Sequence, residues 1–165
     1  MKAILTLCLI FLASLLHAEA LPDPQGDVIL SVSGDIAVTN GEGVARFDRA
    51  MLEALAQRTT TTMTPWYETS RAFSGPLGQA LLEAVGAQGQ TVRIFALNDY
   101  SADVPVEDFQ SHPVILATHA DGQPLSIRDK GPLFLIYPFD EAPELFNEVY
   151  FGRSVWQIAR IEVLD

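Results

Sequence analysis

The sequence predicts a single domain that mixes helices and strands, an α+β fold. The 165 residues are 48% apolar, which is enough for one domain with its own hydrophobic core. Short runs of strand-forming residues recur along the chain between turns rich in glycine, proline and aspartate. Stretches with the periodicity of amphipathic helices are few and short, and no linker or internal repeat divides the chain.

The first twenty residues, Met1 to Ala20, are expected to be a signal peptide. Lys2 supplies a positive charge, Ile4 to Leu16 form an apolar run, and Ala18-Glu19-Ala20 match the small-x-small cleavage pattern. The apolar run is short for a membrane span. We therefore expect residues 21–165 to form the mature domain, in the periplasm or secreted.

Cleavage would remove the only cysteine, Cys8, so the mature chain would contain no thiol. Disulfides, thiolate metal ligands and a thiol nucleophile are then excluded. The remaining 9 basic and 20 acidic residues give a net charge of −11. Such a charge disfavours binding to nucleic acid and to anionic membranes. No later segment is long and apolar enough to be predicted as a membrane span.

The first half of the mature chain is expected to hold strands and two helices. Val28–Ser33 alternates as a strand, and Ile36–Thr39 is expected to pair back on it. Asp48 can cap a helix in which Met51, Leu52 and Leu55 form the apolar stripe. Thr59–Thr64 is β-branched and predicts a strand. Pro76 suits the first turn of a second helix that stops at Gly86.

The second half is expected to be mainly β-structure. Asp121-Gly122 favours a tight reversal, because glycine tolerates positive φ and aspartate can bond its own backbone. An apolar run closed by Pro138 is typical of a strand buried on both faces. The predicted strands are Thr91–Ala96, Tyr100–Val104, Val114–His119, Leu133–Tyr137 and Trp156–Val163.

Four segments follow one another along the chain: Phe73-Ser74-Gly75-Pro76-Leu77, Asn98-Asp99-Tyr100, the turn-and-strand stretch Asp121–Pro138, and Arg153-Ser154-Val155-Trp156. In this order they resemble the molybdopterin-binding domain of the sulfite oxidase family. The resemblance extends over roughly Val28 to Val163 and implies one sulfite-oxidase-type domain with mixed sheets. It also implies a pterin or molybdopterin-like ligand.

The chain departs from the family at the metal. The resemblance implies a molybdenum-ligating cysteine about ten residues before Phe73, near Met63-Thr64, and neither side chain supplies a thiolate. Soft thiolate ligation holds and tunes such a metal. A thioether ligand at Met63 is an alternative, but a methionine beside a strand is more often packing. We therefore expect no molybdenum and no catalytic residue.

Several aromatic and polar residues remain as candidates for holding a pterin. Trp66 and Tyr67 follow Pro65 in a polar stretch, where they can form a stacking platform or close the edge of the domain. Asp99 in the Asn98-Asp99-Tyr100 segment can accept hydrogen bonds from the aminopyrimidine edge of a pterin.

The basic candidates lie at strand ends. Arg128 and Lys130 form either an anion cradle beside Gly131 or a solvated loop. The resemblance places them, with Arg153 and Ser154, near the cofactor phosphate and pterin. Trp156 either packs in the hydrophobic core or lines the binding site. We expect Asp99, Arg128 and Arg153 to converge on one cleft with Trp66, since loops at strand ends present binding groups.

Other chemistries find little support. His112 and His119 are the only histidines after Ala20, too few to predict a zinc site. Ser74 lacks the glycine-flanked elbow of hydrolases, and Gly41-Glu42-Gly43 lacks a third glycine for a dinucleotide loop.

Two functional hypotheses follow. The first is a periplasmic, non-catalytic pterin-binding protein that reports its ligand to a membrane receptor, such as the periplasmic domain of a cyclase or kinase. The alternative is a molybdopterin-dependent oxidoreductase of the sulfite oxidase family.

Overall fold

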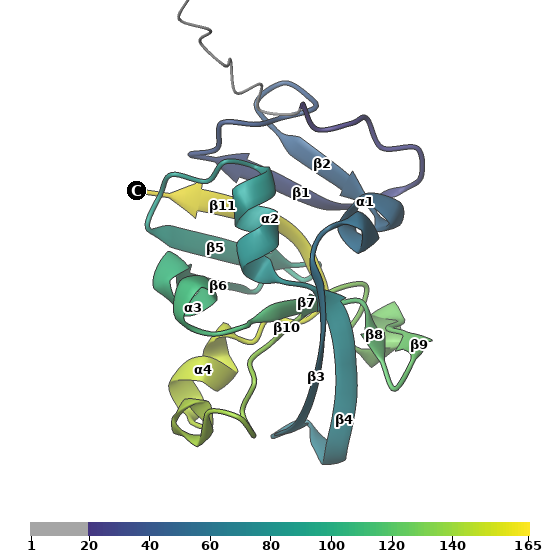
Figure 1. Cartoon of the computed structure of the whole chain (residues 1–165), viewed down its shortest axis with the longest axis vertical. Coiled ribbons are helices and arrows are strands. Elements are labelled where there is room, and N and C mark those ends of the chain that lie inside the picture. The colour runs from purple at the N-terminus through teal and green to yellow at the C-terminus, as the bar shows by residue number, and fades with distance from the viewer. Residues whose placement is uncertain (1–19) are drawn as a thin grey trace, which may run out of the picture.

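The computed structural model describes residues 20–165 (Figure 1). The predicted signal peptide lies outside these residues except for Ala20. Across the described range, no helix combines the length and the apolar character needed to cross a membrane.

A five-stranded sheet forms the upper half of the molecule in Figure 1. Its strand order brings the first and last strands of the domain together, and they run parallel while all other neighbours are antiparallel. The strands in spatial order are β2 (Ala45–Asp48), β1 (Val28–Gly34), β11 (Ile158–Leu164), β5 (Thr91–Ala96) and β6 (Ser101–Pro105).

Two smaller sheets form the lower half. A long hairpin of β3 (Gln57–Thr64) and β4 (Tyr67–Pro76) projects away from the main sheet, with its tip at the bottom of Figure 1. The short strands β8 (His119–Ala120) and β9 (Gln123–Pro124) extend it. A separate pair, β7 (Ile115–Ala117) and β10 (Phe134–Ile136), lies between this hairpin and the main sheet.

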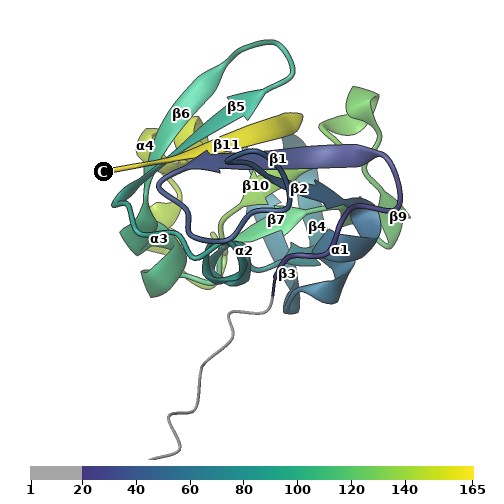
Figure 2. The same cartoon turned by 90° about the horizontal axis from the view of Figure 1, so that it is seen from above.

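The helices are short. Figure 2 shows α1, α2 and α3 on one face of the main sheet, while Figure 1 shows α4 below β6 and α3 in the lower half of the molecule. Asp48 caps α1 as predicted, because its side chain accepts the N–H of Met51. The helices are α1 (Arg49–Ala54), α2 (Gly78–Ala84), α3 (Val106–Ser111) and α4 (Glu148–Arg153), with 3₁₀ turns at Ile127–Asp129 and Pro143–Leu145.

The core lies between the main sheet and these helices and continues into the lower sheets. Its centre is the run Leu133–Tyr137, all of whose side chains are buried. The prediction that Leu133–Tyr137 is a strand buried on both faces is therefore confirmed.

Gly75 allows β4 to pass very close to β7, since a Cβ there would overlap the carbonyl oxygen of Leu116.

The α+β prediction is confirmed, with local exceptions. Ile36–Thr39 forms no strand, and Ile36 makes only an isolated bridge to Ala87. Pro76 ends β4 instead of starting a helix, and Leu77 becomes the cap of α2. The expected strand Val114–His119 is divided at Thr118, whose N–H bonds to Ser74 on β4.

Candidate functional site

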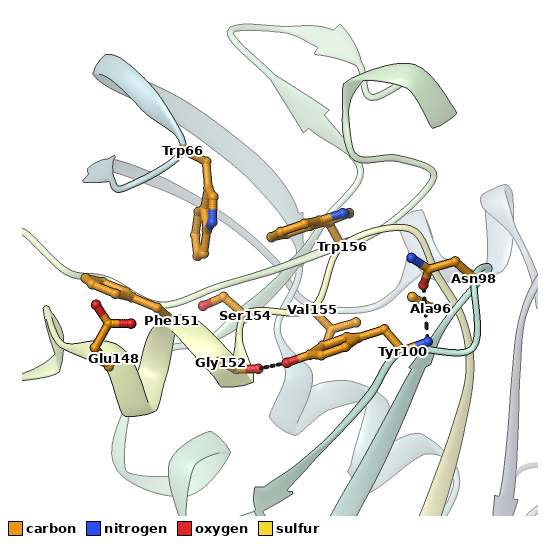
Figure 3. Close-up of a pocket in the computed structure, with 10 residues that line it drawn as sticks. All are labelled: Trp66, Ala96, Asn98, Tyr100, Glu148, Phe151, Gly152, Ser154, Val155 and Trp156. Atoms are coloured by element: carbon orange, nitrogen blue, oxygen red, sulfur yellow. Dashed lines mark hydrogen bonds between the residues drawn. The ribbon is translucent and has the colours of Figure 1, made fainter.

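A pocket of about 380 Å³ lies where three separate parts of the chain meet (Figure 3). The tip of the β3–β4 hairpin contributes Trp66. The end of β5 and the turn before β6 contribute Ala96, Asn98 and Tyr100. The third part is α4 and the segment that leads into β11, with Glu148, Phe151, Gly152, Ser154, Val155 and Trp156.

Two indole rings form one side of the pocket. Trp66 and Trp156 meet edge to face, with their ring centroids 5.7 Å apart. Phe134 lies 5.3 Å from Trp66 and 6.1 Å from Trp156, so the buried strand β10 supports both rings. Trp66 is thus anchored by packing and also exposed to the pocket. Both roles considered for it from the sequence, edge packing and ligand wall, are compatible with this position.

Hydrogen bonds tie the β5–β6 turn to α4 across the pocket. The Tyr100 hydroxyl donates to the carbonyl oxygen of Gly152 at 3.0 Å (Figure 3). Asn98 Oδ1 accepts the backbone N–H of Tyr100 at 3.1 Å, which leaves the amide nitrogen of Asn98 available as a donor. The Ser154 hydroxyl donates to the carbonyl of Tyr150 at 2.8 Å. The opposite wall of the pocket is therefore held by its own polar contacts.

A polar cluster behind the pocket fixes α4. Asp108 on α3 accepts hydrogen bonds through Oδ2 from the Tyr137 hydroxyl at 2.7 Å and from Arg153 Nη1 at 2.9 Å. The Arg153 guanidinium also lies over the ring of Tyr150. Burial, and then the bond to Asp108, raise the pKa of Tyr137 far above its ordinary value. Tyr137 thus remains a neutral donor to Asp108.

Lys130 approaches the pocket wall from a neighbouring loop. Its ammonium lies 4.4 Å from the ring centroid of Trp156 and 5.9 Å from that of Tyr67. Tyr67 itself does not line the pocket. Its ring packs against Phe73 and under Arg71, its hydroxyl is buried without a hydrogen-bond partner, and burial raises its pKa.

The predicted convergence of Asp99, Arg128 and Arg153 on one cleft is wrong. None of the three lines the pocket. The Asp99 side chain is 94% exposed and is 4.0 Å from Arg160, while Arg153 binds Asp108. Arg128 is exposed and forms no hydrogen bond or ion pair with any residue in 20–165. Of the other predicted residues, Tyr67 and Lys130 do not line the pocket either, whereas five do: Trp66, Asn98, Tyr100, Ser154 and Trp156.

Three pocket residues on α4 had no signal strong enough to predict them. Glu148, Phe151 and Gly152 lie on a six-residue helix that no apolar periodicity marks. The available signal was Asn147, whose side chain accepts the N–H of Val149 and so caps the helix.

The fold and the pocket define a small α+β domain with an aromatic-walled site of the size that suits a heterocyclic ligand. The model for the oxidoreductase molybdopterin-binding domain family matches residues 48–165, and the chain belongs to this family.

A solved structure of the sulfane dehydrogenase SoxCD from Paracoccus pantotrophus has a similar fold, with a TM-score of 0.61 and 18% identity. The match covers 82% of this chain but only 38% of that one. No curated protein sequence gives a match.

The residues present do not fit a thiolate-ligated molybdenum. The described residues contain no cysteine, and neither Met63 nor Thr64 lines the pocket. Met63 is 37% exposed on β3, where its N–H bonds to the carboxylate of Asp140. Within residues 20–165, no three histidine, cysteine or acidic side chains gather as a metal site. The indole rings of Trp66 and Trp156, by contrast, line the pocket and offer aromatic faces for stacking.

Proposed function

We propose that this chain binds a pterin-type heterocycle in the pocket and does so without a cysteine-ligated molybdenum. The pair of indole rings carries this proposal. A flat ring gains stacking energy from tryptophan whatever its substituents, and polar groups at the pocket ends can fix its orientation. Family membership supports a ligand with a pterin ring. The described residues argue against a bound molybdenum, because they offer no cysteine and no cluster of histidine and acidic side chains to bind it.

The proposed role is reversible binding and not catalysis. Catalysis in this family would require a tuned metal, and no described side chain near the pocket replaces the thiolate. The leader-like sequence Met1–Ala20 supports a location outside the cytoplasm. In the proposed pathway, the loaded protein reports the pterin to the periplasmic domain of a membrane receptor, a cyclase or a kinase.

Titration of the mature chain with 6-hydroxymethylpterin tests the binding proposal. The sequence has two tryptophans, both in the pocket wall, so quenching of their fluorescence reports on the site. Trp66→Ala should lose about 1–3 kcal/mol of binding free energy, the scale measured for base–aromatic stacking, and Trp66→Phe should lose less. Equal affinity in the wild type and both variants would remove Trp66 from the site.

The alternative is an oxidoreductase that uses complete molybdopterin, and membership of the family is the observation that favours it. Elemental analysis of protein purified from a periplasm separates the two functions. We expect no stoichiometric molybdenum. About one molybdenum atom per chain would establish the alternative and refute the proposal.

A further inference from the structure

The two ends of the pocket differ in hydrogen-bonding character. Figure 3 shows Glu148 and Asn98 at opposite ends, with Trp66 and Trp156 between them. At the Asn98 end, the amide nitrogen is a free donor, and the indole nitrogen of Trp156 lies on the same side. At the other end, the Glu148 carboxylate can only accept. A ligand that spans the pocket therefore needs donors at one end and acceptors at the other.

Among residues 20–165, Glu148 is the only charged side chain that lines the pocket. Within residues 20–165 it makes no hydrogen bond and no ion pair, although it lies on the same helix as Arg153. Arg153 is occupied by Asp108 and stacks on Tyr150, so it does not neutralise Glu148. The carboxylate thus remains free to bind a ligand.

We propose that Glu148 is the specificity residue that recognises the aminopyrimidine edge of the ligand. This inference rests on the proposed function. The 2-amino group and the neighbouring ring N–H of a pterin are adjacent donors, and a carboxylate can accept both at once. With that edge at Glu148, the ring stacks against the tryptophan wall and its side chain reaches the donors at Asn98.

This assignment defines the class of ligand more narrowly. A 2-amino-4-oxo ring presents donors to Glu148, whereas a 2,4-dioxo ring of the lumazine or flavin type places an oxygen there. That oxygen would face the carboxylate without a proton between them, which is an unfavourable contact. The site should therefore prefer pterins to lumazines. Asp99, the residue expected from the sequence to read this edge, is directed to solvent instead.

The test compares two ligands on three proteins. The ligands are 6-hydroxymethylpterin and 6-hydroxymethyl-lumazine, which differ in the group at position 2, amino or oxo, and in the proton that the lumazine carries at N1. The proteins are the wild type, Glu148→Gln and, as a control, Glu144→Gln. Glu144 is a nearby exposed carboxylate that does not line the pocket, so both variants remove one charge from the same region.

We expect the wild type to bind the pterin roughly tenfold or more tightly than the lumazine, the scale of one hydrogen bond to a charged group. Glu148→Gln should lose most of this preference, and Glu144→Gln should keep it. Equal affinity of the wild type for both ligands overturns the inference, as does an unchanged preference in Glu148→Gln. If the wild type binds neither ligand, the proposed function itself fails.

Discussion

Replacing Asp108 should destabilise the domain much more than replacing an exposed aspartate that also pairs with an arginine. Asp108→Ala leaves the Tyr137 hydroxyl without its acceptor and the Arg153 guanidinium without its counter-charge. The side chains of Asp108 and Arg153 are 10% and 23% exposed, and Tyr137 is fully buried. Water can therefore reach Arg153 but not the tyrosine hydroxyl.

The expected loss of folding free energy follows from these exposed fractions. Removing one partner of a fully buried ion pair costs about 3–5 kcal/mol, and an orphaned buried hydroxyl costs about 1–3 kcal/mol. Because Arg153 keeps partial contact with water, we expect a combined loss of about 2–4 kcal/mol. For a domain of this size that corresponds to a fall in Tm of roughly 6–12 °C.

Thermal unfolding followed by circular dichroism measures this effect, and Asp103→Ala is the matched control. Asp103 pairs with Arg93 at 2.7 Å, but the two side chains are 51% and 40% exposed. Exposed pairs contribute little to stability, so its Tm should change only slightly. If the two variants melt together, the Asp108 cluster does not hold α4 and the reasoning is refuted.

Two further predictions concern stability. Backbone N–H groups of Met51, Gly26 and Gln25 lower the pKa of Asp48. The ionised carboxylate therefore stabilises the folded state at pH values above its ordinary pKa, and this stabilisation is lost as the pH falls through the lowered pKa. Plots of Tm against pH should therefore fall more steeply in acid for the wild type than for Asp48→Asn; parallel plots would contradict this. Gly75→Ala should sharply lower Tm because its Cβ would overlap a β7 carbonyl, whereas Gly152→Ala, with open space around it, should not. Similar melting of these two variants would refute the close-packing argument.

Local patterns predicted most of the fold because they act over a few residues. Leu133–Tyr137 is apolar throughout and is buried throughout, and Asp48 caps the helix that follows it. The missed helix α4 is different. Its sequence, Glu148–Arg153, has no apolar stripe, and it is held by tertiary contacts that no local pattern records, chiefly Arg153 with Asp108 and Phe151 with Trp66.

The site was predicted in part for a similar reason. Aromatic residues and turn residues mark positions where a pocket can form, and Trp66, Trp156 and Asn98 lie there. The direction of a side chain in a turn depends on the local backbone conformation, which the residue types alone do not fix. Asp99 has φ 65°, and its side chain is in solvent while Asn98 and Tyr100 beside it line the pocket. The sequence identifies Arg153 as a cation, but it could not show that Arg153 forms an ion pair with Asp108.

On the proposed function, the manner of ligand retention would separate this domain from a metal enzyme. A thiolate-ligated cofactor is held by a coordination bond and stays with the protein through many turnovers. A ring held by Trp66, Trp156 and the Glu148 carboxylate would depend on stacking and on hydrogen bonds that water can replace. On the proposed function, such a ligand would exchange with its surroundings, and the occupancy of the pocket would follow the ligand concentration. At the pocket, the Tyr100 hydroxyl bonds the β5–β6 turn to Gly152 of α4, and Tyr100 is itself half exposed, so this contact lies at an exposed surface. On the proposed function, that surface is where occupancy would be read by a receptor.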